Sequence, residues 1–155
     1  MSVRIVRAML VIVVVAIPLV ALAQSGPLFP GDKSIFPIDG SGDVTIQDYS
    51  GMKPGQSEDK IWKFYNAGTV EWKDRQLMLT ANEKNEMPLN VPKFAKLPDT
   101  KPGKECRPKV RVTVPKDAKP GENRAAYYKQ VIKRGKDWVL CFPDKKAIYV
   151  VVKVQ

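Results

Sequence analysis

Hydrophobic and polar residues alternate with a period of two along most of the chain after residue 42. The clearest example is KVRVTV, where three valines face one way while Lys109, Arg111 and Thr113 face the other. This alternation is typical of a half-buried antiparallel strand. Other segments of the same kind are VTIQDY, KIWKFYN, VEW, QLMLTA, NRAAYYKQVIK, DWVLCF and AIYVVVKV.

Turn signals separate these segments. Clusters of Pro, Gly and Asn occur at residues 54–55, 66–68, 102–103 and 120–121, and no segment has a convincing helical period. Residues 82–108 carry five prolines, which predict a long connection or an edge strand. Seven or eight short strands within about 112 residues predict an all-β fold, and their spacing favours an antiparallel β-sandwich.

The N-terminal residues follow a different pattern. Arg4 and Arg7 precede an unbroken apolar run at residues 8–23, which ends in the A-x-A pattern of Ala21-Leu22-Ala23. These three parts predict a secretory signal peptide over residues 1–23. The alternative is an uncleaved membrane anchor formed by residues 8–23. In both cases we expect an exported protein of the periplasm, the cell envelope or the extracellular space.

Two further segments complete the predicted organisation. Residues 24–42 are rich in Gly, Pro and Ser and predict a linker. Its scattered apolar residues, Leu28, Phe29, Ile35 and Phe36, could still dock on the domain. Residues 43–155 form the single predicted domain, which is large enough to bury a core.

The stretch IWKFYNAGTVEW allows two interpretations. It could present its aromatic rings as an exposed binding platform, or it could form two strands of a core joined by a turn. Trp62 and Phe64 share one face, and Asn66 and Gly68 supply turn residues before Trp72. We favour the core, because such a face must pack against a second sheet.

The spacing of these motifs continues beyond Trp72. The motifs in chain order are Pro54-Gly55, Lys60-Ile61-Trp62, Phe64, Asn66-Ala67-Gly68, Trp72, Leu77, Leu79, Leu97, Pro102-Gly103, the alternating strand that ends at Pro115, and Pro120-Gly121. Together they resemble the four-tryptophan (FW) domain, which is found in the next-to-BRCA-one autophagy receptor and in many bacterial proteins. Tyr127 or Tyr128 stands where the family has its third tryptophan, and Tyr149 stands in place of the fourth.

This resemblance implies an immunoglobulin-like antiparallel β-sandwich of seven to eight strands. It also implies a non-catalytic binding module that contacts an envelope or extracellular protein. The expected core residues are Trp62, Phe64, Trp72, Leu77, Leu79, Val110, Val112, Val114, Tyr127 and Tyr149. The expected turn residues are Asn66, Gly68, Gly103 and Gly121.

The two cysteines, Cys106 and Cys141, are expected to form a disulfide in an exported protein. The bridge would close a loop of 35 residues and stabilise the fold by roughly 4 kcal/mol. The alternative is two reduced thiols within a β core. Two cysteines without histidine do not make a structural zinc site.

Composition narrows the function classes further. The chain has no histidine, which excludes Ser-His-Asp triads, Cys-His pairs and histidine-based metal sites. We therefore expect neither an enzyme nor a cofactor. The formal net charge is +10, which raises the alternative of an electrostatic binder of anionic envelope polymer or lipid, whereas nucleic acid is not expected. The candidate anionic-ligand patch consists of Lys93, Lys96, Lys101, Lys104, Arg107 and Lys109.

Overall fold

The computed structural model describes residues 25–37 and 40–155, and within these residues the fold is all-β. The predicted signal peptide and residues 24, 38 and 39 of the predicted linker lie outside the described residues. The described part contains twelve strands and no helix, so it holds no helix that is long and apolar enough to cross a membrane. The all-β prediction is confirmed.

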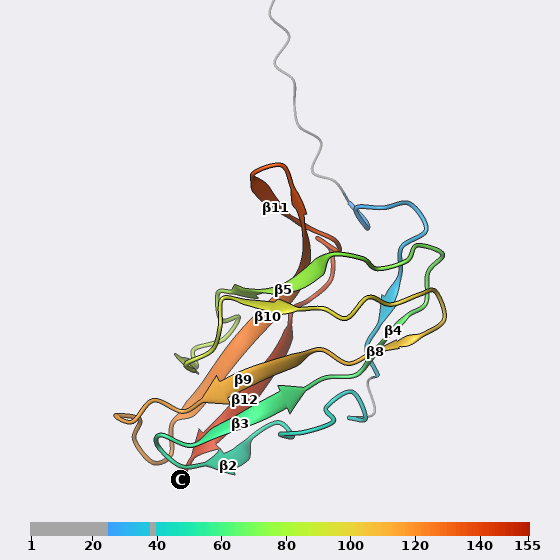
Figure 1. Ribbon diagram of the computed structural model, residues 1–155. Helices are drawn as coiled ribbons and strands as arrows, with labels where there is room; N and C mark the ends of the chain where they lie inside the picture. The colour runs from blue at the N-terminus through green and yellow to red at the C-terminus, as the bar shows by residue number, and fades with distance from the viewer. Residues whose placement is uncertain (1–24, 38–39) are drawn as a thin grey trace, which may run out of the picture.

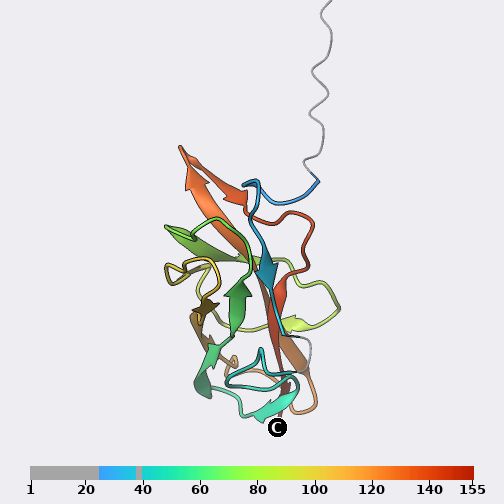
Figure 2. The same cartoon turned by 90° about the vertical axis from the view of Figure 1, so that its right-hand side faces the viewer.

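The strands form two layers. The larger sheet has the order β2-β12-β10-β5-β7, while β6 and β11 pair with other parts of the long strand β10. Its strands are β2 (Ser50–Met52), β5 (Arg75–Thr80), β6 (Met87–Pro88), β7 (Phe94–Lys96), β10 (Asn123–Arg134), β11 (Asp137–Leu140) and β12 (Ile148–Val154). In Figure 1, β3 and β9 cross in front of β10 and β12, and the turned view of Figure 2 places the two sets side by side.

The second layer consists of two small sheets, and β4 and β9 come directly after β3 and β8 along the chain. One sheet pairs β3 with β9, and the other has the order β1-β4-β8. The strands are β1 (Ser34–Ile35), β3 (Ser57–Ile61), β4 (Phe64–Asn66), β8 (Glu105–Cys106) and β9 (Lys109–Thr113). The Trp62 amide still donates a hydrogen bond to the Pro108 carbonyl at 3.2 Å, so the pairing continues across the interruption.

Strand number and direction differ from the expectation. The proline-rich residues 82–108 contribute β6, β7 and β8, three strands of two or three residues each, and the stretch around Trp62 is split into β3 and β4. Two pairs, β2 with β12 and β6 with β10, are parallel. Both β2 and β6 are short edge segments beside a long strand, so the sheet is mixed where the sequence predicted an antiparallel one.

The core lies between the layers and contains the aromatic residues of the stretch that the sequence singled out. Trp62 and Trp72 are fully buried, and Phe64 and Leu77 are nearly so. The alternating valines of β9 and the residue after it are 0–1% exposed, whereas Leu79 is only partly buried. These three valines are Val110, Val112 and Val114. Burial of these residues supports the interpretation of the stretch as core. The expected pair of strands joined by a turn is wrong, because β4 pairs with β1 and β8, and Trp72 makes only an isolated bridge to Thr100.

Tyr149 is a correction to the predicted core. Its side chain is 37% exposed, because β12 places Val150, Val152 and Val154 toward the core and the alternate residues on the outer face. On that face Tyr149 packs against Tyr127, with ring centroids 5.3 Å apart. Tyr127 is buried, but in a second small cluster with Ala125, Ala147 and Val151.

The predicted linker is partly built into the fold. Ser34 and Ile35 form β1, and the buried Asp32 accepts hydrogen bonds from Arg75 at 2.7 Å and from the Trp72 indole at 2.8 Å. The ring of Phe29 lies 5.2 Å from the Arg75 guanidinium. This segment therefore docks on the domain and adds an edge strand to it.

The predicted turn residues are at turns, but not all for the expected reason. Gly103 and Gly121 have positive φ angles of 74° and 89°. Asn66 and Gly68 do not; instead, the Asn66 amide donates to the carbonyls of Val70 and Thr100, at 2.8 and 3.0 Å. A side chain on Gly68 would approach the Gly31 carbonyl oxygen to 2.4 Å. Gly68 is therefore required by close backbone packing.

The predicted disulfide is wrong, because both cysteines are free and buried in different surroundings. The Cys106 thiol donates to the Pro98 carbonyl at 3.7 Å. Cys141 lies beside Arg75 and Asp32, and burial is the main cause that raises its pKa to about 11. Burial likewise raises the pKa of Cys106 to about 11. The alternative of two reduced thiols in a β core describes this structure.

Candidate functional site: a cleft between the two layers

A cleft of about 570 Å³ opens between the layers, beside β1 and the start of β12. Its apolar walls come from both layers, with Phe36 and Phe64 on one side and Leu77, Tyr128 and Ile148 on the other. Ligand sites in proteins commonly have volumes of about 300–1,000 Å³ and mostly apolar walls. The cleft therefore has the size and lining of a binding site.

Gln130 supplies an unused hydrogen-bond donor at this cleft. The residue lines the cleft, and its amide nitrogen Nε2 is buried with no acceptor among the described residues. A buried donor without a partner costs about 1–3 kcal/mol, so most such groups are satisfied by protein, water or a ligand. A ligand acceptor in the cleft would remove this cost.

The rim of the cleft carries charges of both signs. Lys129, Lys145 and Lys146 line it, and none of them makes an ion pair within the described residues. On the other side, Asp43 is paired with Lys60, and burial, together with the charge of Asp43, raises the pKa of Asp48. The cations of the rim are available to a ligand, whereas Asp43 is already neutralised.

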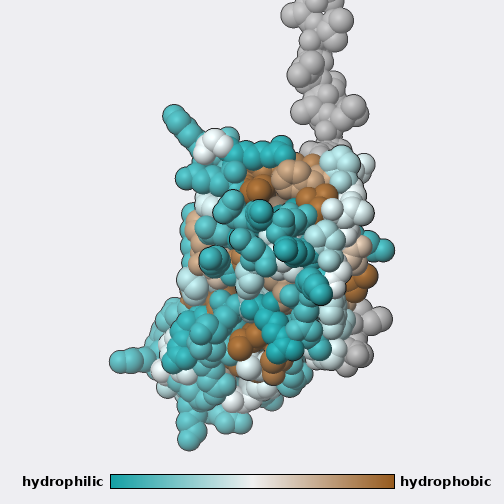
Figure 3. Space-filling view, turned by 45° about the vertical axis from the view of Figure 1, so that its right-hand side comes forward, coloured by the Kyte–Doolittle hydropathy of each residue, from teal (hydrophilic) through white to brown (hydrophobic). Residues whose placement is uncertain are grey.

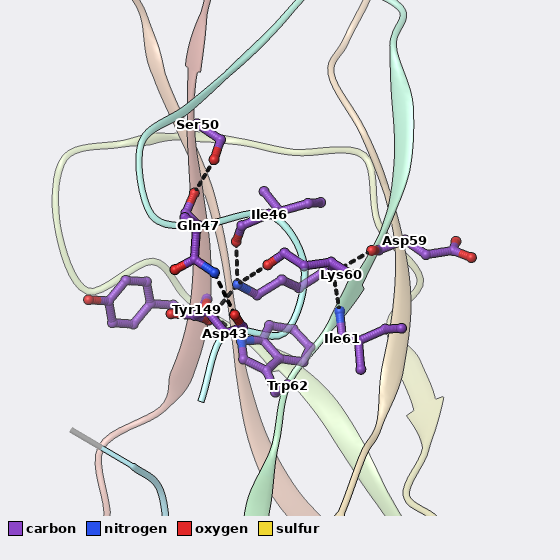
Figure 4. A network of polar contacts seen from close by, with 10 residues as sticks. Asp43, Ile46, Gln47, Ser50, Asp59, Lys60, Ile61, Trp62 and Tyr149 are labelled. Carbon is purple, nitrogen blue, oxygen red and sulfur yellow. Dashed lines mark hydrogen bonds and ion pairs between the residues drawn. The ribbon is translucent and has the colours of Figure 1, made fainter. Parts of the chain in front are cut away.

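Lys60 anchors the loop that forms the acidic side of the cleft (Figure 4). Its side chain is fully buried, and its ammonium group donates to Asp43 Oδ1 at 2.5 Å and to the carbonyls of Ile46 and Thr45 at 2.6 and 3.4 Å. Burial lowers the pKa of Lys60, and the hydrogen bond from Lys60 to Asp43 opposes this effect. All three donors are used, so Lys60 holds the loop and is not a free nucleophile.

The described residues contain no group of three or more Cys, Asp or Glu side chains placed to hold a metal ion. Both thiols have pKa values raised to about 11 by burial, which keeps them protonated and unreactive at neutral pH. The cleft itself offers an apolar recess, one amide donor and several ammonium groups.

The six residues of the predicted anionic-ligand patch are all exposed, but they do not all come together. Lys96, Arg107 and Lys109 border a shallow depression with Pro98 and Asp99. Arg107 is paired with Glu105, and Lys109 with Asp59 at 3.4 Å, so two of these three charges are partly neutralised. The remaining three residues, Lys93, Lys101 and Lys104, do not line the depression.

On the face shown in Figure 3, the exposed apolar side chains form separate small areas. In the view of Figure 3, hydrophilic side chains cover most of the face, and hydrophobic ones gather near the top of the view and in a second area lower down. Small scattered apolar areas of this kind are normal for a protein surface. The cleft, which enters the core, is the more distinctive feature.

From the sequence, no residue was expected to line a cleft. Phe64, Leu77 and Tyr149 were expected to be core, and Tyr128 was named only as an alternative to Tyr127 at the third tryptophan position. Phe36 was noted only as a residue that could dock. Gln130, Lys145 and Lys146 had no signal of their own, because one amide within a strand and two lysines in a connection are common surface features.

Comparisons with known proteins add little. No family model matches the chain, and no curated protein matches it. Among solved structures, the chain is similar to the secreted serine protease VesC from Vibrio cholerae, with 12% identity and a TM-score of 0.35. The similarity covers 81% of this chain and 23% of the protease, so the chain spans about a quarter of that protein's length. A similarity this weak says nothing about the activity of this chain.

Proposed function

We propose that this chain is an exported, non-catalytic binding module with an immunoglobulin-like β-sandwich domain of the FW type, and that it contacts a protein at the cell envelope. The observation that carries the proposal is the cleft between the layers, with its apolar walls, its unpartnered Gln130 amide and its unpaired lysines. The two packed layers and the buried tryptophans support the proposed fold. The proposed export to the cell envelope rests on the signal-peptide pattern of residues 1–23.

A binding role suits the chemistry better than catalysis. The sequence has no histidine, and the buried Lys60 uses its donors to hold a loop. A nucleophile needs a base within hydrogen-bond reach. The chain has no histidine, and Asp32, the carboxylate beside Cys141, is already paired with Arg75. The residues of the cleft can instead recognise apolar and anionic groups.

A second candidate function is the binding of anionic envelope polymer or lipid by exposed basic residues. The depression bordered by Lys96, Arg107 and Lys109 is the observation that favours it. Such binding is dominated by charge and should weaken steeply as salt screens it. Binding in the cleft should depend less on salt because its apolar walls contribute as well.

The two functions can be separated with the chain that begins at Gln24, which contains every described strand. We would immobilise this protein and apply envelope extract at low and at high salt. Ser34→Trp places a bulky side chain in the cleft from its rim, and Ile35→Trp is the matched control because Ile35 is 44% exposed and does not line the cleft. Circular dichroism and the melting temperature would verify that both variants fold.

We expect a defined protein to remain bound to the wild type and to Ile35→Trp at high salt, and to be lost from Ser34→Trp. Anionic material that salt releases equally from all three proteins would support the second function instead. If no protein is retained by the wild type under either condition, the proposed function is wrong.

A further inference from the structure

β1 presents a free backbone edge beside the cleft. It is the outer strand of the β1-β4-β8 sheet. The Lys33 carbonyl accepts a hydrogen bond from the Ala67 amide at 2.9 Å, toward β4. Backbone groups alternate in direction along a strand of an antiparallel pair, so the N–H and C=O of Ser34 point to the opposite edge. No described strand pairs with that edge.

The side chains of the same strand lead into the cleft. Ser34 and Phe36 line it, while the Ile35 side chain between them is exposed on the other face. An extended chain that paired with the free edge of β1 would alternate in the same way. Every second side chain of that chain would therefore point into the apolar recess between Phe36 and Ile148.

The charged residues around the recess indicate which charge a chain bound there should carry. Lys145 and Lys146 stand at the rim with no ion pair among the described residues, next to the exposed Asp144. The other carboxylates that line the cleft are Asp48 and Asp43, of which Asp43 is paired with Lys60. Nearby, the Glu83 carboxylate accepts a hydrogen bond from the Ala147 amide at 3.4 Å. The buried Nε2 of Gln130 lacks an acceptor. The ligand should thus supply carboxylates near the lysines and a carbonyl or other acceptor near Gln130.

We propose that the free edge of β1 and the cleft together bind an extended acidic segment of a protein partner, which adds a strand to β1, inserts an apolar side chain into the cleft and places carboxylates beside Lys145 and Lys146. This inference rests on the proposed function and names the class of partner. Strand addition provides affinity through main-chain hydrogen bonds and specificity through side-chain pockets. A lipid could fill the recess, but it has no backbone groups with which to pair with β1.

The test uses fluorescein-labelled peptides and the chain that begins at Gln24, measured by fluorescence anisotropy. The probe is a decapeptide in which Thr alternates with Phe or Val and which carries two Glu at each end. One comparison peptide has Lys in place of every Glu, and a second has proline at alternate positions, which removes the ladder donors. We expect the acidic peptide to bind at least about tenfold more tightly than either one.

Variants of the protein test each contact separately. Ser34→Pro removes the N–H that points to the free edge, whereas Ser34→Ala retains it, so only the first should weaken binding. Reversal of the rim charges in Lys145→Glu/Lys146→Glu should weaken binding of the acidic peptide by about tenfold or more and improve binding of the lysine peptide. Lys133→Glu/Lys136→Glu changes two exposed lysines away from the cleft and should have a much smaller effect.

The results separate this inference from the proposed function. If the acidic peptide does not bind, or binds Ser34→Pro and the charge-reversed protein as well as the wild type, the inference is wrong. The proposed function would nevertheless stand if Ser34→Trp still loses its envelope protein. If decanoate binds in the cleft and no peptide does, the occupant is a lipid and the inference is likewise overturned.

Discussion

Lys60 shows how a single charged side chain can be accommodated in a β core. Its ammonium group meets one carboxylate and two carbonyls, and the Trp62 ring lies 5.6 Å away. The transfer of this charge from water is unfavourable, and burial accordingly lowers the pKa of Lys60. The hydrogen bonds offset that cost and tie the loop of residues 43–50 to β3, beside the cleft. Loss of one partner should therefore be more harmful than loss of both.

We predict that Lys60→Met lowers the free energy of unfolding by about 3–5 kcal/mol, because Asp43 and the carbonyl of Ile46 would lose their donor. The double variant Lys60→Met/Asp43→Leu should recover part of this loss. Urea denaturation would measure both, with Lys53→Met at an exposed position as the control. A loss below about 1 kcal/mol in Lys60→Met would show that the buried pair does not stabilise the fold.

At the scale of elements, β1 depends on a close approach of two backbone segments. The carbonyl of Gly31 accepts a hydrogen bond from the Thr69 amide at 2.9 Å, and a Cβ on Gly68 would come within 2.5 Å of the Lys33 amide nitrogen. The buried Asp32 then joins this segment to Arg75 on β5. A short edge strand of two residues is thus held by packing and by an ion pair from the other layer.

Gly68→Ala tests this arrangement. The three nearest atoms that the new methyl group would meet all belong to the backbone, so the segment that leads into β1 must shift. We expect a loss of about 1–3 kcal/mol in stability. Hydrogen exchange should become faster at residues 33–36 in particular. Ala67→Ser, a substitution at the exposed neighbour, is the control. Unchanged exchange at β1 would mean that the close approach does not hold the strand.

At the scale of the whole molecule, the core buries groups that must stay neutral. Burial raises the pKa of Cys106 and Cys141 from 9.0 to about 11, and it raises the pKa of Tyr127 to about 12. A group whose pKa is higher in the folded state stabilises the fold fully below its unfolded pKa. That contribution is lost as the pH rises through the folded pKa. Lys60 has the opposite effect, because its pKa is lowered in the folded state. Its contribution to the free energy of unfolding therefore increases as the pH rises through its folded pKa.

We therefore predict that stability falls between pH 9 and pH 11 by up to about 1.4 kcal/mol per pH unit for each thiol. Urea denaturation in the presence of a reductant at several pH values would show it. The variant Cys106→Ala/Cys141→Ala should be less stable at pH 7.5, because it leaves small cavities, but its stability should fall less steeply above pH 9. Equal slopes for the two proteins would show that the thiols titrate alike in both states.

Several features of the fold could be predicted because they depend on neighbours in the sequence. The alternation at residues 109–114 requires three valines on one face of a strand, and such a face is stable only when it is buried. For the same reason, Trp62 and Phe64 had to enter a core together. The absence of helical periods led to an all-β fold.

The structure was needed wherever the outcome depends on residues that are distant in the sequence. Period two tells which residues share a face, but the pairing of β12 with β10 and β2 decides that Tyr149 lies outside. Whether Cys106 and Cys141 lie close enough to form a disulfide likewise depends on how segments that are distant in the sequence are placed.

The cleft belongs to this second group, since it is assembled from β1, β4, β5, β10 and the connection into β12. Alternation and turn residues determined by themselves that the described part of the chain is all-β, with Trp62 and Trp72 in the core. Only the tertiary structure decided which polar groups are buried without partners and where the two layers remain open, because both depend on distances that no local pattern encodes.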